Sequence, residues 1–252
     1  MEKEKRNKVI GIVAGIVGFI ASAIGIFVFV TGKNLPDIFP AKPANAQDYV
    51  VGEIVHFGQW DWRVLAVEDG KALLIAGDII EQRPYNDKLT GVTWENCTLR
   101  AYLNGEFLEK FSAQERAKIC ETENVNGNNQ WFGTNGGRNT TDKVFLLSIE
   151  EVVKYFGDSR QLKNKNPRSE YWIDDQYNDE RAAKFNNDSL WWWLRSPGPD
   201  QYNAADIRLN GNVSFRGYNV HREEGGLRPA LWAKQPKKCL LSNIYHLKSR
   251  KD

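Results

Sequence analysis

The chain has 252 residues, a formal net charge of +2, and a balance of 41% hydrophobic and 26% charged residues. This length suits one sizeable globular domain with appendages, and the near-neutral charge gives no support for a dedicated nucleic-acid-binding protein. The nine Trp and twelve Phe residues favour a rigid, sheet-rich core.

Residues 9–31 are predicted to form a single transmembrane helix, because they carry no charged side chain and are long enough to cross a bilayer core of about 30 Å. Residues 1–8 are basic, so the positive-inside rule places them in the cytoplasm and the rest of the chain outside. Glycine and other small residues at four-residue spacing would allow a homodimer through this helix, although such residues are common in membrane helices anyway. The alternative of a cleaved signal peptide requires a shorter apolar run with a nearer cleavage site.

Residues 32–48 contain three prolines and are predicted to be a spacer between the membrane and a globular domain. That extracytoplasmic domain is expected to span residues 49–233. A basic tail, residues 234–252, follows it. The tail would be solvated and frayed, or would lie on polyanions of the cell envelope.

Alternating residues predict strands at 51–57, 60–67 and 72–76, with Asp69-Gly70 as the turn between the last two. A helix is expected over residues 93–102. Two capping boxes, Ser112 with Glu115 and Ser148 with Glu151, predict helices that run to Cys120 and to Phe156.

Residues 121–141 are rich in Asn and Gly and are predicted to be a loop, and residues 143–147 a short buried strand. The expected fold class is therefore α+β, with short antiparallel sheets and two or three helices. A final sheet-rich part is expected to begin at Trp191.

A hairpin is predicted between residues 205 and 216, where apolar and polar residues alternate. A two-residue loop would set apolar residues opposite polar ones. A three-residue loop, residues 210–212, sets Ile207 opposite Phe215 and Asp206 opposite Arg216, so that each face pairs like with like. The sequence therefore predicts a three-residue loop, one apolar face and one polar face.

The polar face and its flanking loops are the candidate ligand-binding site, because Tyr, Asn and Arg are typical of adaptable contact surfaces. A polar face that simply meets water is the competing interpretation. The ten candidates are Tyr202, Asn203, Asp206, Arg208, Asn210, Asn212, Arg216, Tyr218, Asn219 and His221.

No catalytic motif is found, and no catalytic residue or cofactor is predicted. The acidic residues Asp174, Asp175 and Asp179 are weak candidates for calcium binding, since oxygen ligands at this density can hold that ion, but a solvated loop is the commoner outcome. Cys97, Cys120 and Cys239 are expected to be structural or incidental thiols. A bridge between the first two would require an oxidising compartment.

The sequence resembles the bacterial domain-of-unknown-function family 6273. The segments that carry the resemblance are Trp62 to Leu65, Ala72 to Ile75, Thr93 to Arg100 with Leu103, Asn104 and Phe107, Thr141 to Ser148, Trp192 to Gly198, and Leu227 to Leu231. Cys97 stands where the family more usually has Ser, which argues against a role for that thiol. The family carries no established activity.

The C-terminal end is also similar, more weakly, to the C-type-lectin-like fold of formylglycine-generating enzymes and of retroelement-diversified binding proteins. That similarity implies ligand binding through residues 199–224. The oxidase activity of formylglycine-generating enzymes does not carry over, because it needs a cysteine pair that is missing near this end.

The sequence thus predicts a membrane-anchored binding module at the bacterial cell surface, with an unidentified protein or glycan as its ligand. One alternative is a hydrolase-type enzyme for cell-envelope polymers, with Asp142, Asp175 and Asp179 as general acid and base. Another is a structural subunit of a membrane assembly.

Overall fold

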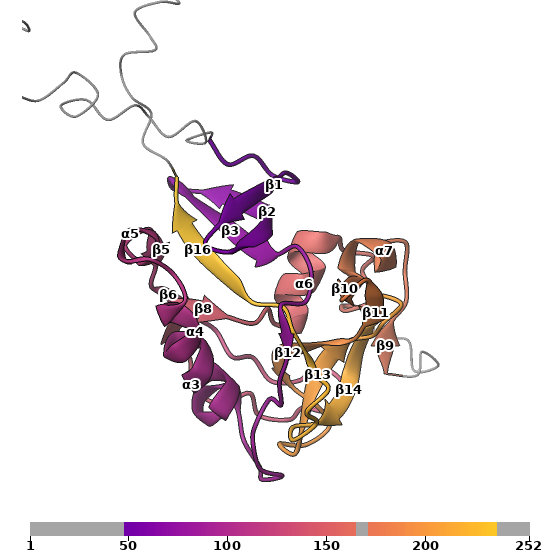
Figure 1. Ribbon diagram of the computed structural model, residues 1–252. Helices are drawn as coiled ribbons and strands as arrows, with labels where there is room; N and C mark the ends of the chain where they lie inside the picture. The colour runs from indigo at the N-terminus through magenta and orange to yellow at the C-terminus, as the bar shows by residue number, and fades with distance from the viewer. Residues whose placement is uncertain (1–47, 165–170, 236–252) are drawn as a thin grey trace, which may run out of the picture. The chain divides into compact units, whose positions relative to one another are not determined.

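A computed structural model describes residues 48–164 and 171–235 (Figure 1). The predicted cytoplasmic segment 1–8, the predicted membrane helix 9–31, nearly all of the spacer and most of the basic tail lie outside the described residues. Within the described ranges, no helix combines the length and apolar character needed to cross a bilayer.

The first sheet begins with the three strands that the sequence predicts. Its members are β1 (Ile54–Phe57), β2 (Trp60–Glu68), β3 (Lys71–Ala76), β16 (Ala230–Lys234) and β5 (Ile119–Cys120) in spatial order, with β8 (Val144–Phe145) also paired to β16. Asp69 and Gly70 have φ values of 49° and 72°, as a tight two-residue hairpin turn requires. The β2–β3 hairpin and its turn are confirmed.

The second sheet contains the C-terminal hairpin. In spatial order it is formed by β4 (Glu81–Gln82), β15 (Gly226–Leu227), β12 (Trp192–Pro197), β13 (Asn203–Ile207), β14 (Val213–Asn219) and β9 (Trp172–Ile173). Two small hairpins complete the strands: β6 (Thr122–Asn124) with β7 (Thr140–Asp142), and β10 (Ala183–Phe185) with β11 (Asp188–Leu190). In Figure 1, β1, β2, β3 and β16 gather at one end of the domain and β13 and β14 at the other.

Helices in the described residues are short. They are the 3-10 helix η1 (Trp94–Asn96), and α3 (Thr98–Asn104), α4 (Glu106–Glu109), α5 (Ala113–Arg116), α6 (Ile149–Phe156) and α7 (Asn178–Arg181). Both predicted capping boxes are present, on Ser112 and Ser148. The expected helix over 93–102 is divided at Cys97 into η1 and α3.

The α+β class is confirmed, with short sheets that are antiparallel except for the parallel pair β12 and β15. Three local predictions are wrong. The helix that starts after Ser112 ends at Arg116 and not at Cys120, because Ile119–Cys120 pairs with β16. The predicted loop 121–141 contains β6 and β7. More than three helices form, since α4, α5 and α7 are single turns that carry little sequence signal.

The predicted hairpin register is also wrong. Ile207 pairs with Val213 and Asp206 with Ser214, so that five residues, Arg208 to Asn212, form the loop. Leu209, expected on the apolar face, is 59% exposed in that loop. The pairing also shifts within the hairpin, where Gly217 adopts a φ of 61°. A Cβ at Gly217 would lie 1.6 Å from the Ala204 carbonyl oxygen, so the bulge requires glycine.

Contacts outside the hairpin set this register. The Gly211 carbonyl accepts a hydrogen bond of 2.9 Å from Arg181 Nε, and a Cβ on Gly211 would lie 1.9 Å from the Asn178 carbonyl oxygen. The loop is therefore packed against α7. Strand β13 is moreover flanked by β12 and β14, and its central residues are buried on both faces. Alternation of apolar and polar residues shows which side chains face the core only in a strand whose other face meets water. Because β13 is buried on both faces, the alternating pattern predicted the wrong register.

Candidate binding surface

Two tryptophans of the segment Trp191–Gly198, Trp192 and Trp193, are framework residues. Trp192 and Trp193 are fully buried, and their indole nitrogens donate to the carbonyl oxygens of Arg181 at 3.0 Å and of Arg83 at 2.9 Å. Each Trp thus supplies buried aromatic area and satisfies its one polar group. No ligand is needed to explain them.

Arg195 in the same segment joins several elements. Its guanidinium binds both carboxylate oxygens of Glu151, at the start of α6, and also the carbonyl oxygens of Leu146 at 2.8 Å and Val125 at 3.2 Å. The buried charge is therefore paired, and its N–H donors are occupied by hydrogen bonds. The planar guanidinium favours this arrangement because it presents several donors in fixed directions. Next to it, Ser196 Oγ accepts from the Ile149 amide at 3.0 Å.

The segments Trp191–Gly198 and Gly226–Trp232 are called the signature segments. Arg228, between β15 and β16, is the counterpart of Arg195 in the second of them. It lies where the chain passes from the second sheet to the first, and it donates to the carbonyl oxygens of Ala76, Gly77 and Arg181 at 2.9, 3.0 and 3.1 Å. Burial lowers the pKa of Arg228 to about 10, so it stays charged at neutral pH. Its function is to hold the two sheets together.

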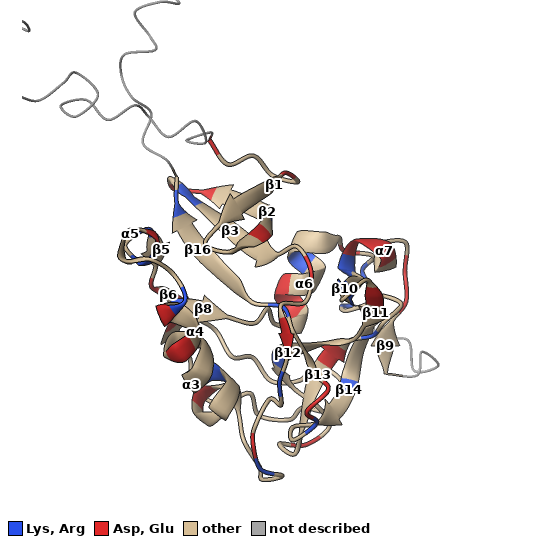
Figure 2. Ribbon diagram, in the orientation of Figure 1, with Lys and Arg blue, Asp and Glu red and all other residues tan. Residues whose placement is uncertain are grey.

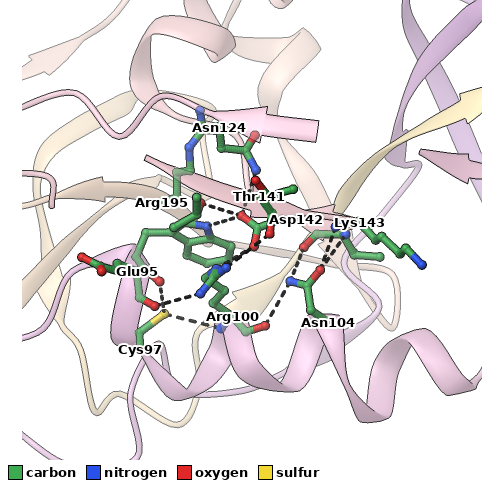
Figure 3. A network of polar contacts seen from close by, with 12 residues as sticks. Glu95, Cys97, Arg100, Asn104, Asn124, Thr141, Asp142, Lys143 and Arg195 are labelled. Atoms are coloured by element: carbon green, nitrogen blue, oxygen red, sulfur yellow. Dashed lines mark hydrogen bonds and ion pairs between the residues drawn. The ribbon is translucent and has the colours of Figure 1, made fainter. Parts of the chain in front are cut away.

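Asp142 is the centre of a third buried network (Figure 3). Its carboxylate accepts from Trp94 Nε1 at 3.0 Å, Arg100 Nε at 2.6 Å, Asn124 Nδ2 at 2.9 Å and Thr140 Oγ1 at 2.7 Å. The residue is 2% exposed. Four donors occupy the lone pairs that a general acid or base would use, so the geometry favours a structural role for this carboxylate.

The acidic residues around α7 serve the hairpin loop. Asp175 pairs with the buried Arg181 at 2.5 Å, and Arg181 in turn holds the Gly211 carbonyl. Burial alone would raise the pKa of Asp175, but hydrogen bonds from Ser159 and Arg181 hold it below its ordinary value. Asp174 Oδ1 accepts from the Asn178 amide at 2.5 Å.

In the described part of the chain, no group of three or more His, Cys, Asp or Glu side chains is placed to hold a metal ion. Calcium binding by Asp174, Asp175 and Asp179 stays a prediction, which a thermal-unfolding measurement with and without calcium tests.

The ten candidate site residues divide by exposure. Five are exposed (Tyr202, Asn210, Arg216, Asn219, His221), three are half-buried (Asn203, Arg208, Tyr218) and two are buried (Asp206, Asn212). The uniform polar face expected from the sequence is therefore not found. Asn212 is buried because its Oδ1 accepts from the Asn178 amide at 2.7 Å, which ties the loop to α7.

Tyr218 is the centre of an aromatic and guanidinium cluster on β14. The Arg208 guanidinium lies 4.3 Å from the centre of its ring, and that of Arg222 lies 5.7 Å away. Trp191 packs against the ring with a centroid distance of 4.4 Å. Trp191 and Arg222 were absent from the predicted set. The crowding of Tyr and Arg around residue 218 was the available signal for Arg222.

A shallow depression of about 420 Å³ adjoins this cluster through Arg222. It is lined by Asn219, His221, Arg222, Glu223 and Glu224. Arg222 pairs with Glu224 at 2.7 Å. A second recess of about 320 Å³ lies at the first sheet, where Glu68, Asp69, Glu121 and Glu123 are among its lining residues. Because the first depression shares Arg222 with the Tyr218 cluster, it is the stronger candidate for a ligand.

Asp206 lies beneath this surface with its carboxylate fully buried. Its neighbours across the strands are Trp193 on β12 and Ser214 on β14. Arg208 Nε is 3.4 Å from Oδ2, yet neither carboxylate oxygen has a hydrogen bond of good geometry. Ser214 Oγ accepts from Arg208 and from the Gly217 amide, so its own hydrogen is free to turn toward Asp206. Burial raises the pKa of Asp206 to about 7, and Arg208 opposes this rise.

Cys97 and Cys120 are both free and buried. Cys97 has a structural role: its sulfur accepts from the Arg100 backbone amide at 3.4 Å and caps α3. This is the N-cap position, where Ser is a preferred residue. Burial raises the pKa of the Cys97 thiol to about 12, so it is not a nucleophile at neutral pH.

Together, these features define an α+β domain with two main sheets, a framework of buried arginines and one exposed hairpin surface. The family model described as domain of unknown function DUF6273 matches residues 69–235, and the chain belongs to that family. The match begins at the β2–β3 turn and includes both signature segments. No curated protein and no solved structure matches the chain, so the similarity to C-type-lectin-like folds is not confirmed.

Proposed function

We propose that this protein is a membrane-anchored, extracytoplasmic binding module, and that its ligand contacts the Tyr218 cluster and the adjoining depression. The ligand would be a protein or glycan at the cell surface. The observation that carries the proposal is the half-buried Tyr218 ring between Arg208, Arg222 and Trp191. Tyr, Trp and Arg are the residue types that contribute most to binding energy at contact surfaces.

The composition of this surface supports the proposal further. Over most of the described ribbon, basic and acidic residues are interspersed (Figure 2). The signature arginines are occupied by backbone carbonyls and by Glu151, whereas the guanidinium of Arg208 is directed at a buried carboxylate and an aromatic ring. Exposed polar residues follow on both sides, with Tyr202, Asn219 and His221 among them.

A hydrolase acting on envelope polymers is less well supported by the described residues. Such an enzyme needs two carboxylates that face one substrate bond. Asp142 is enclosed by four donors, and Asp175 is paired with Arg181.

The test uses the full chain in lipid nanodiscs, with bacterial cell-wall fragments and a glycan array as probes. Tyr218→Ala should reduce binding at least about 10-fold, as loss of a central aromatic contact of roughly 1.4–2 kcal/mol implies. Thermal unfolding is measured in parallel to show that the variant still folds.

Tyr155→Ala is the matched control. Tyr155 is also half-buried and carries a cation over its ring, with Lys154 Nζ at 4.6 Å, but it lies on α6. Binding should be unchanged in this variant. Equal binding by the wild type and Tyr218→Ala would reject the site, and equal loss in both variants would point to a general loss of fold.

A further inference from the structure

One charge at the candidate surface is incompletely neutralised. Arg208 has a single carboxylate within ion-pair distance in the described residues, Asp206 at 3.4 Å, and its side chain is 27% exposed. Its Nη2 donates to Ser214 Oγ at 3.2 Å, which is a neutral acceptor. A guanidinium offers five N–H donors, so several remain for a ligand at the exposed side.

The counter-ion itself is poorly stabilised. Asp206 is fully buried and lacks hydrogen bonds of good geometry, unlike the four-donor carboxylate of Asp142. A buried carboxylate in this state binds a proton readily. With Asp206 protonated, Arg208 is a cation without a charged partner beside the Tyr218 ring. An anionic group of a ligand would neutralise its charge.

The adjoining depression has a different chemistry. Asn219, His221, Glu223 and the Arg222–Glu224 pair offer both donors and acceptors, and its lining includes no aliphatic side chain. Peptide recognition commonly depends on an apolar anchor in a pocket. A lining of mixed donors and acceptors is instead suited to a ligand rich in hydroxyl groups.

We propose that the surface binds an acidic saccharide, whose carboxylate pairs with Arg208 over the Tyr218 ring while its hydroxyl groups occupy the depression lined by Asn219 and Arg222. This rests on the proposed binding function and names its ligand class. Asp206 is the positioning residue: it holds Arg208 in place and competes with the ligand for its charge.

The competition gives the site a direction of pH dependence. As the pH rises from 6 to 8, Asp206 loses its proton, pairs with Arg208 and repels the ligand carboxylate. Binding should therefore weaken as the pH rises. Arg208 is the one charged side chain within ion-pair distance of Asp206 in the described ranges, and the neighbours on β12 and β14 are Trp193 and Ser214.

The experiment uses the full chain in nanodiscs and an array of uronic-acid, sialic-acid and neutral oligosaccharides. Each acidic oligosaccharide that binds is compared with its carboxyl-reduced form. The reduction should lower affinity at least about 10-fold, as loss of a charge-assisted hydrogen bond implies. Arg208→Gln should cause the same loss for the acid and almost none for the reduced sugar. Arg138→Gln is the control, because Arg138 is 87% exposed and pairs with Glu95 instead.

Asp206→Asn should remove the decline in binding between pH 6 and pH 8. His221→Gln, which removes the imidazole of the depression, should retain that decline.

Binding of neutral sugars that depends on Tyr218 but not on Arg208 would overturn the proposal of an acidic ligand and leave the proposed function standing. Binding of cell-wall fragments through Tyr218, with no saccharide bound, would also overturn it. Failure of the wild type to bind any probe would count against both proposals.

Discussion

The signature segments and the β13–β14 hairpin are adjacent in sequence and differ in how their polar groups are used. In the signature segments, Arg195 and Arg228 are buried and bind carbonyl or carboxylate oxygens through several donors. In the hairpin, Asp206 is equally buried and has no hydrogen bond of good geometry. The strongest sequence pattern therefore marks the part of the domain that secures the fold.

This contrast separates stability from function. A residue whose every polar atom is occupied within the protein has nothing left to offer a ligand, and its substitution acts through folding. A residue held incompletely, such as Arg208, keeps capacity for an external partner. Substitutions in the two regions should differ in sign as well as in size.

Arg195→Met should have the largest effect. It leaves the Glu151 carboxylate without its ion-pair partner and the carbonyl oxygens of Leu146 and Val125 without the Arg195 donors, at a cost of about 3–5 kcal/mol in the free energy of unfolding. Urea denaturation measures this loss. Arg138→Met, at an exposed ion pair, should change stability by less than about 1 kcal/mol. An equally small loss of stability in Arg195→Met would show that Arg195 does not stabilise the framework.

Asp142→Asn should be the next largest. The amide retains one acceptor oxygen but turns a donor toward Trp94, Arg100, Asn124 or Thr140, so that a loss of about 2–4 kcal/mol is expected. A neutral outcome would mean that the network in Figure 3 contributes little to stability.

Asp206→Asn should change the free energy of unfolding in the opposite direction, towards greater stability. The folded-state pKa of about 7 lies above the ordinary value of 3.8, so the stability that this carboxyl confers is present at low pH and is lost as the pH rises through 7. At about 1.4 kcal/mol per pKa unit the limit is about 4 kcal/mol, and the pKa of about 7 already includes the opposing effect of Arg208.

The variant should therefore be more stable than the wild type by up to about 4 kcal/mol at pH 8 and nearly equal to it at pH 4. Urea unfolding at both pH values provides the comparison. Destabilisation at pH 8 would show that the ionised Asp206–Arg208 pair is favourable, and that the hairpin resembles the framework after all.

The sequence predicted best the structural features, such as turns and helix caps, that depend on residues close together in the chain. Asp69-Gly70 defines its own turn by backbone conformation, and Ser112 and Ser148 define their caps by reaching three residues along the chain. The α+β class follows from the same local signals.

The remainder depends on contacts distant in sequence. The hairpin register is set by Arg181 and Gly211, thirty residues apart, and by strands on both sides. The short strands β5 and β6 form because partners elsewhere accept them. Among the candidate site residues, Tyr202, Arg208 and Tyr218 were proposed from composition and stay predictions. The burial of Asp206 was hidden, since its position on a central strand is a property of the whole sheet.

The smallest expected effect on stability is at Cys97. Its substitution tests whether a framework residue can be replaced by one that keeps the same hydrogen-bonding groups. Its sulfur caps α3 by accepting from the Arg100 amide and lies near the Trp94 carbonyl. Cys97→Ser keeps an acceptor and a donor in place and should change stability by less than about 0.5 kcal/mol, whereas Cys97→Ala should cost about 1 kcal/mol. Guanidinium denaturation at an unchanged slope resolves this difference. Equal losses in both variants would show that packing of the sulfur, and not the cap, is what α3 requires.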